Sequence, residues 1–130
     1  TKYLSFGDCP SSSSPSTCAS GTGFHLTPLI GPTTVRAVQI QTAVDVPQRD
    51  PLTMTLEGSN QTGSALFSGS SWILIYSGLT GLTMDPGRST FGVKQIFSNS
   101  IAYTSYRVLM TSKRNTSNSI QYAEIELLIM

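Results

Sequence analysis

Apolar and polar residues alternate along most of the chain, which is the spacing of half-buried β-strands. In residues 52–57 (LTMTLE) every second side chain is apolar, and residues 38–41 and 106–111 repeat this alternation. Each segment is therefore predicted to be a strand with one face in the core and the other in water.

The C-terminal residues show the same period of two. One face carries two glutamates, Glu124 and Glu126, and we expect that face to be exposed. A slip of one residue in register would bury both carboxylates, so the register should be firmly set. The face predicted to point into the core consists of Ala123, Ile125, Leu127 and Ile129.

Residues 72–76 (WILIY) are apolar on both faces, which predicts a central strand that is covered on both sides. Turn-forming residues separate the strand-like segments, for example Pro47 and residues 58–60 (GSN) and 85–87 (DPG). Helical periodicity with caps is missing, so helix should be marginal. The pattern predicts an all-β sandwich or jelly roll that occupies residues 1–130 as a single domain.

The composition fits an extracellular β protein better than a nucleic-acid-binding one. Only 12% of the residues are charged and the net charge is +1, which provides no basic patch for nucleic acid. The sequence contains no apolar run of about 18 residues, the length that a transmembrane helix needs. The chain opens at Thr1 almost directly in a strand-like segment, and we expect that a leader or a larger, multidomain parent protein precedes it.

Two cysteines, Cys9 and Cys18, flank a segment rich in Ser and Pro. We predict a local disulfide between them, which implies an oxidising compartment; two buried free thiols are the alternative. The triplets at residues 60–62 (NQT) and 115–117 (NTS) fit the acceptor pattern for N-glycosylation. These features favour a secreted or cell-surface location.

Several stretches, in order along the chain, resemble the discoidin-like, galactose-binding-like modules of the coagulation factor type C superfamily. They are residues 1–6 (TKYLSF), 23–28 (GFHLTP), 35–60, 71–75, 102–107 and 118–127. The resemblance spans nearly the whole chain and implies a jelly-roll β-sandwich of about eight antiparallel strands. It also implies carbohydrate binding through loops at one end, although relatives bind phospholipid or protein, so the fold alone does not identify the ligand.

The resemblance further implies a structural calcium ion between the first and last strands. Thr1, Glu124 and the backbone carbonyl of Ala123 match the positions that usually contribute ligands. Calcium accepts such a mixture of carboxylate and carbonyl oxygens. The alternative for Glu124 is an ordinary outward-facing strand carboxylate. Two departures from the family pattern are the loop between the cysteines, in place of a short turn, and Val44, where relatives often carry Asn.

Asp45, Arg49 and Asp50 lie close together in one loop that Pro47 and Pro51 stiffen. Their directional donors and acceptors suit sugar hydroxyls. Alternatively, Arg49 and Asp50 brace the loop through hydrogen bonds to the backbone. We favour bracing for these two residues, which leaves Asp45 as the better candidate for ligand contact.

Four further residues, and the single histidine, are candidates for ligand contact. Asn99 and Asn118 lie in loops that we expect to reach the same end as Asp45, although Asn is more often a turn former. Phe67, in a Gly/Ser-rich loop, is the candidate for an exposed aromatic ring that stacks on a sugar. Trp72 is predicted to pack in the core, and His25 to be a partly buried strand residue.

The sequence lacks a clear catalytic pair, because it has one histidine and no further clustered carboxylates. We therefore predict a non-catalytic module that binds a glycan or polysaccharide. The alternative is an adhesion module for a protein or a membrane surface, and a purely structural accessory domain is a third interpretation. The Ser-, Thr-, Gly- and Asn-rich loops favour sugar over lipid.

Overall fold

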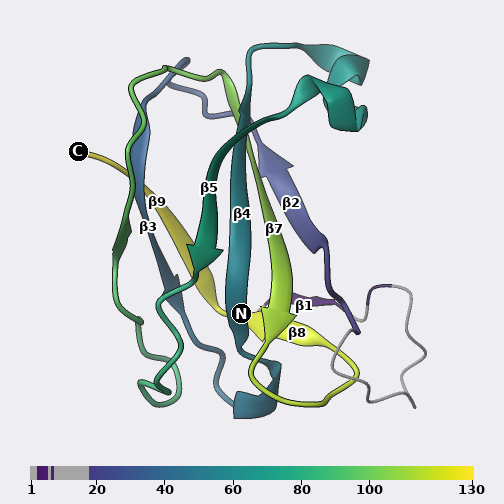
Figure 1. The fold of residues 1–130 in the computed structure, drawn as a ribbon, viewed down its shortest axis with the longest axis vertical. Helices are drawn as coiled ribbons and strands as arrows, with labels where there is room; N and C mark the ends of the chain where they lie inside the picture. The colour runs from purple at the N-terminus through teal and green to yellow at the C-terminus, as the bar shows by residue number, and fades with distance from the viewer. Residues whose placement is uncertain (1–2, 6, 8–17) are drawn as a thin grey trace.

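The computed structural model describes residues 3–5, 7 and 18–130, and in them nine strands form three sheets (Figure 1). The largest sheet has the order β2-β7-β4-β5, the second has the order β6-β3-β9, and β1 pairs with β8. Every pairing is antiparallel. The predicted all-β sandwich is confirmed. Its strands are β1 (Tyr3–Ser5), β2 (Thr22–Leu26), β3 (Val35–Gln41), β4 (Pro51–Ser59), β5 (Ile73–Leu79), β6 (Gln95–Ile96), β7 (Ser105–Lys113), β8 (Ile120–Tyr122) and β9 (Glu124–Ile129).

Helical structure in the described part of the chain is limited to three short 3-10 turns, η1 (Pro47–Arg49), η2 (Gly63–Phe67) and η3 (Gly69–Ser71). Turn η1 lies at the lower end of the sandwich in Figure 1, whereas η2 and η3 project at the upper end. Among the residues described, no helix is long and apolar enough to cross a membrane.

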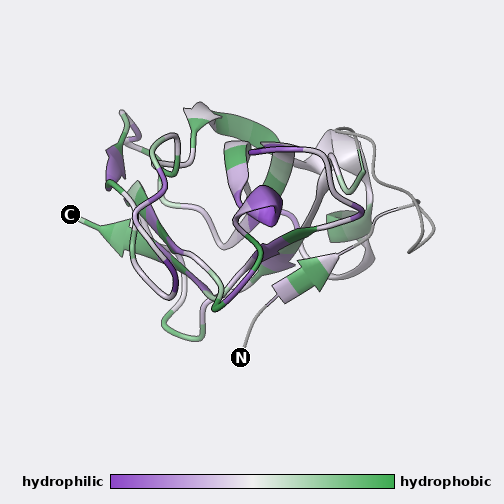
Figure 2. Cartoon of the chain, turned by 90° about the horizontal axis from the view of Figure 1, so that it is seen from below, coloured by the Kyte–Doolittle hydropathy of each residue, from purple (hydrophilic) through white to green (hydrophobic). Residues whose placement is uncertain are grey.

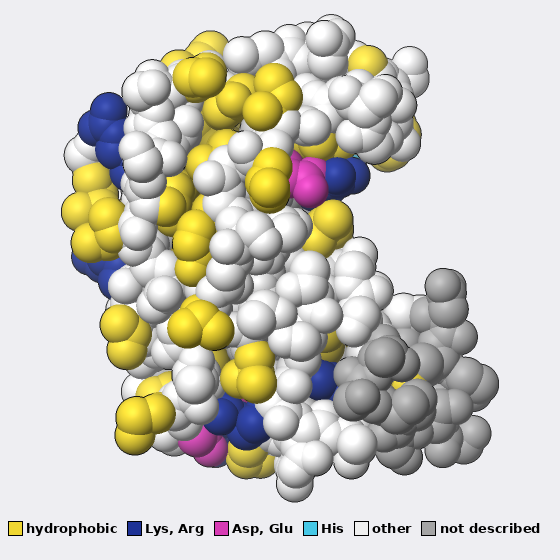
Figure 3. Space-filling view, viewed as in Figure 1, with side chains coloured by type: hydrophobic (Ala, Val, Ile, Leu, Met, Phe, Trp, Pro, Cys, Tyr) yellow, Lys and Arg dark blue, Asp and Glu magenta, His cyan; other side chains and the backbone are white. Residues whose placement is uncertain are grey.

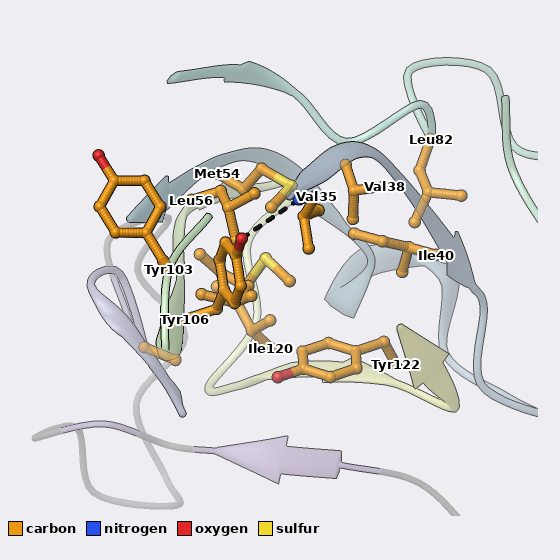
Figure 4. Packing of buried hydrophobic residues seen from close by; sticks show 13 residues of the cluster. Val35, Val38, Ile40, Met54, Leu56, Leu82, Tyr103, Tyr106, Ile120 and Tyr122 are labelled. Carbon is orange, nitrogen blue, oxygen red and sulfur yellow. Dashed lines mark hydrogen bonds between the residues drawn. The ribbon is translucent and has the colours of Figure 1, made fainter. Parts of the chain in front are cut away.

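The core fills the space between the two larger sheets (Figure 4). Met54 and Leu56 of β4 and Val108 of β7 are fully buried, as the alternation predicted, and they face Val38 and Ile40 of β3. Burying an aliphatic side chain of this size stabilises the fold by about 1.5–3 kcal/mol.

One tyrosine ties the two sheets together through its hydroxyl group. Tyr106 of β7 is fully buried. Its Oη accepts a hydrogen bond from the amide of Val35, 3.2 Å away, and donates one to the carbonyl oxygen of Thr33 (Figure 4 draws the first). The buried hydroxyl is thus satisfied on both sides, as an interior polar group must be.

The prediction that residues 72–76 form a central strand is wrong. β5 is the edge of the four-stranded sheet, and the side chains of Ile73 and Leu74 are 57% and 58% exposed. The register between β4 and β5 shifts between Leu56 and Glu57. Such a bulge changes which side chains point inward. Ile75 and Tyr76 instead pack against the core.

The prediction for the last strand is confirmed in part. Ile125 and Leu127 pack against the core, but both are only partly buried, and Ile129 is 57% exposed. Glu126, which lies opposite Gln39 of β3, is half-buried and not exposed as expected. β9 is an edge strand whose inward face borders an open pocket. The alternation therefore predicted correctly which side chains point toward the core, but it overestimated how deeply they are buried.

Candidate functional site

The six predicted ligand residues do not converge on one site. Asp45 follows the end of β3, and Arg49 and Asn118 lie beside it. Asn99 bonds the other end of β3, because its Nδ2 donates to the carbonyl oxygen of Val35 at 2.9 Å. The expectation that Asn99 and Asn118 share one end is therefore wrong, since the length of β3 separates them.

Asp50 is a buried brace at the lower end of the sandwich. Its side chain is fully buried, and both carboxylate oxygens accept hydrogen bonds from Arg88, at 2.9 and 2.6 Å. Arg114 adds a third contact at 3.2 Å. The hydrogen bond to Asp50 raises the pKa of the Arg88 guanidinium, and the hydrogen bond from Arg88 lowers the pKa of Asp85. The structure favours bracing for Asp50, because its acceptors are already in use.

Arg49 and Asp45 both attach to Gln121 of β8, a residue that the sequence analysis did not single out. The Nε2 atom of Gln121 donates to the carbonyl oxygen of Asp45 at 2.5 Å and to its Oδ1 at 3.1 Å. The Nη1 atom of Arg49 lies 3.5 Å from the Oε1 atom of Gln121, and its Nη2 atom lies 3.5 Å from the Oδ1 atom of Asn118. Gln121 is fully buried. Figure 2 views this end and shows η1 as hydrophilic, in keeping with a polar network that closes the sandwich.

A different cluster lies on the outer face of the four-stranded sheet, toward the upper end. His25 of β2 pairs with Arg107 of β7, and Arg107 pairs with Glu57 of β4, so the register places the three side chains in one row. The Nε and Nη2 atoms of Arg107 both donate to the Oε2 atom of Glu57, the first at 2.7 Å. This leaves Nη1 of the guanidinium and Oε1 of the carboxylate outside the pair.

Three aromatic rings complete this cluster. Phe67, at the end of η2, is 82% exposed, which confirms that it is an exposed aromatic. The His25 ring meets the Phe67 ring edge-on at 5.6 Å and lies 5.7 Å from the ring of Trp72. The guanidinium carbon of Arg107 lies 5.1 Å from the Trp72 ring centroid, a cation–π contact. We call Phe67, His25, Trp72, Arg107 and Glu57 the aromatic cluster.

Trp72 and His25 lie in environments that differ in part from those predicted. Trp72 is buried, with 8% of its surface exposed, but it packs beneath η2 and η3 and against the outer row of the sheet rather than between the sheets. His25 lies in a strand as expected, yet it is exposed because its strand position points outward. Spacing along the sequence could not reveal that these residues meet, since β2, β4 and β7 come together only through strand order.

The aromatic cluster has the chemical make-up of a small-molecule recognition site: an exposed ring face, a second ring, and charged donors and acceptors close by. In Figure 3 a hollow opens beneath the projecting upper turns, with an acidic and a basic side chain side by side at its inner end. Aromatic faces provide apolar contact at little cost in conformational entropy, and the polar atoms fix orientation.

The residues predicted to bind calcium and to form the disulfide are only partly described. Thr1 and Cys9 lie outside the described residues. Glu124 is exposed at the start of β9, and the amide of Ala123 donates to the carbonyl oxygen of Gln41 at 2.9 Å. Within the described ranges, no group of three or more His, Cys, Asp or Glu residues is arranged to hold a metal ion. Cys18 is fully buried. Both predictions therefore stay predictions.

No family model matches the chain, and no curated protein matches it either. Among solved structures, the chain is similar to chitosan-binding module 1, derived from a chitosanase/glucanase from Paenibacillus sp. IK-5. The TM-score is 0.48 at 16% sequence identity, over 98% of this chain and 93% of that module.

Proposed function

We propose that this chain is a non-catalytic carbohydrate-binding module of a secreted or cell-surface protein, of the discoidin-like kind that its sequence resembles. The ligand is a neutral or mildly acidic glycan that lies on the aromatic cluster, not on the Asp45 loop. The observation that carries this proposal is the side chain of Phe67, 82% exposed and held edge-on to His25 beside the Arg107–Glu57 pair.

The contacts on the two ends of the sandwich support this choice of site. At the lower end, the Asp50 carboxylate and the carbonyl oxygen of Asp45 already accept hydrogen bonds within the protein. A ligand there would have to replace bonds that are already made, at little net gain. At the aromatic cluster, Phe67 presents an open apolar face, and the outward atoms of Arg107 and Glu57 can bond sugar hydroxyls.

The opposite charges of Arg107 and Glu57 favour a ligand with little net charge. Their ion pair is neutral overall, and the two side chains are 24% and 14% exposed. A strongly anionic or cationic sugar would therefore gain little from this pair. We expect dissociation constants from about tens of micromolar to millimolar, the range for a shallow site with few hydrogen bonds.

Titration with the best ligand from a glycan array tests the proposal. Phe67→Ala should weaken binding by about tenfold or more, because the stacking face is lost. Met84→Ala is the matched control, since Met84 is equally exposed at 85% and lies away from the cluster. Asp45→Ala should leave the affinity unchanged. If Phe67→Ala keeps its affinity and Asp45→Ala loses binding, the glycan binds at the Asp45 loop and not at the aromatic cluster.

A structural calcium ion is a further part of this proposal. Glu124 and the carbonyl of Ala123 supply two oxygen ligands, with Thr1 as the third residue of the set, and calcium needs about six to eight oxygens in total. The ion would join the start of the chain to the start of β9. Adding calcium to EGTA-treated protein should raise the melting temperature, and Glu124→Gln should remove that increase. If calcium raises the melting temperature of Glu124→Gln by the same amount, the ion binds at another site.

An adhesion module that binds a protein partner is the second candidate, and the edge strand β5 favours it. The strand carries exposed Ile73, Leu74 and Leu79, and its sequence contains no charge or proline that would guard the edge. Figure 3 shows hydrophobic side chains spread over the face that includes β5. A glycan array without any hit, together with capture of a protein that Leu74→Lys abolishes, would favour this candidate.

A further inference from the structure

The sandwich is open on the side where β2 and β9 form the edges of their sheets. A pocket with a volume of about 300 Å³ lies there, lined in part by Leu26 of β2, Val35 of β3, and Leu127 and Ile129 of β9. The alternation of the last strand predicted that Ile129 faces a filled core. Instead, the inward face of β9 borders a space that no side chain of the described residues fills.

The wall of this pocket is mostly apolar, and two of its polar groups, the hydroxyl of Tyr106 and the backbone amide of Thr33, are already hydrogen-bonded. The lining contains no charged residue. The Tyr106 hydroxyl donates to the carbonyl oxygen of Thr33 and accepts from the amide of Val35 at 3.2 Å. The amide of Thr33 donates to the carbonyl oxygen of Tyr103 at 3.1 Å. A bound ligand would therefore contact mainly hydrocarbon, because these polar groups are already hydrogen-bonded within the protein.

The rim of the pocket is also apolar. A tight turn, closed by a 3.2 Å hydrogen bond from the amide of Gly31 to the carbonyl oxygen of Pro28, presents Leu29 and Ile30 with 104% and 79% exposure. Gly31 has a φ of 92°, which an L-amino acid adopts only with strain. Ile30 itself lines the pocket. Exposed aliphatic residues gathered around an apolar hollow mark a binding surface.

We propose that this pocket binds the alkyl chain of a single-chain amphiphile, with the polar head group left in solvent. A sugar would bury many hydroxyl groups against a wall that is mostly hydrocarbon and offers few partners for them, which is costly. The volume admits a chain of several carbons and is near the lower limit of ligand pockets, about 300–1,000 Å³. This site is separate from the aromatic cluster.

The test is a calorimetric or NMR titration of the whole chain with hexanoate, octanoate and decanoate, each below its micelle-forming concentration. Each methylene group that enters the pocket should tighten binding by about fourfold. Ile129→Gln, at a residue that is 57% exposed, should weaken decanoate binding by about tenfold without unfolding the protein. The matched control is Ile96→Gln on the other edge strand of the same sheet, 67% exposed, which should have no effect.

Several results would overturn the proposal. They are no binding of decanoate, an affinity that does not depend on chain length, or equal weakening by Ile96→Gln. Binding to phosphatidylcholine vesicles without binding of free decanoate would identify a membrane surface instead. A concentration-dependent dimer that Ile129→Gln dissociates would identify a second copy of the chain. Phe67→Ala should leave decanoate binding unchanged, so failure here and failure of the glycan site are distinguishable.

Discussion

The indole nitrogen of Trp72 donates a hydrogen bond to the backbone carbonyl oxygen of Leu66 at 3.0 Å. Leu66 immediately precedes Phe67 in η2, so a buried side chain fixes the turn that carries the exposed ring. The edge-on contact with His25 holds the ring from the other side. A preorganised ring face loses less entropy on binding than a mobile one.

Trp72→Phe tests this positioning role. The substitution keeps an aromatic ring and removes the hydrogen bond to Leu66, so we expect stability to fall by about 1 kcal/mol and glycan affinity to fall severalfold. Tyr76→Phe is the control, because it removes a comparable 2.7 Å hydrogen bond to the carbonyl of Leu79 on β5. Urea unfolding and calorimetry measure the two effects. If both variants lose stability alike and both keep full affinity, Trp72 has no positioning role.

Asp50→Ala should destabilise the protein strongly. The carboxylate is fully buried and pairs with Arg88 and Arg114, so its removal leaves two guanidinium groups without their main partner. Breaking a buried pair in this way costs about 3–5 kcal/mol. Asp85→Ala removes a partly exposed contact to the same arginine and should cost less than about 1 kcal/mol. Equal losses of unfolding free energy in the two variants would contradict the bracing role.

Tyr122→Phe should reduce the loss of folding stability at high pH. Burial of the hydroxyl raises the pKa of Tyr122 above its usual value of 10.0. The unfolded chain therefore releases its proton first, and stability falls as the pH rises above about 10 toward the folded-state pKa. The Oη atom is buried and has no hydrogen-bond partner among the described residues, so the phenylalanine variant should be as stable as the parent at pH 7.

The measurement is the unfolding free energy between pH 7 and 11. The variant should lose less stability than the parent over the alkaline part of this range. Tyr3→Phe is the control, because Tyr3 stacks on Tyr122 with ring centroids 4.7 Å apart and donates its own hydroxyl to the carbonyl of Gly23 at 3.3 Å. If the parent and Tyr122→Phe lose the same unfolding free energy at alkaline pH, a group other than Tyr122 causes that loss of stability.

The predicted disulfide between Cys9 and Cys18 is tested by counting thiols in denatured protein that has not been reduced. We expect none, and reduction should lower stability by about 2.5–3 kcal/mol in the chain-entropy model. Two thiol equivalents would instead support the alternative of buried free cysteines. In the folded protein Cys18 is fully buried, and the Nζ atom of Lys113 donates to its backbone carbonyl at 2.7 Å. Reduction should therefore perturb the end of β7 as well.

Period-two alternation was sufficient to predict the all-β architecture and the inward faces of β4 and β7. Met54, Leu56 and Val108 are fully buried as predicted, because a strand places alternate side chains on opposite faces whatever its neighbours are. The exposed ring of Phe67 was also predictable, since a Gly/Ser-rich loop offers little to cover it. A bracing role for Asp50 was also predicted from the sequence, but through hydrogen bonds to the backbone, whereas its carboxylate pairs with the side chains of Arg88 and Arg114, which lie far away in the sequence.

Only the tertiary structure decided which strands lie at edges and which side chains meet. The apolar run of residues 72–76 predicted a central strand, but β5 ends its sheet, and nothing in a local pattern records how many neighbours a strand has. Glu57, His25 and Arg107 lie far apart in the sequence, and the register of β2, β7 and β4 brings them into one row. Local sequence specifies the period of a strand, whereas sheet order and register arise from long-range pairing, so the aromatic cluster could be found only in the folded chain.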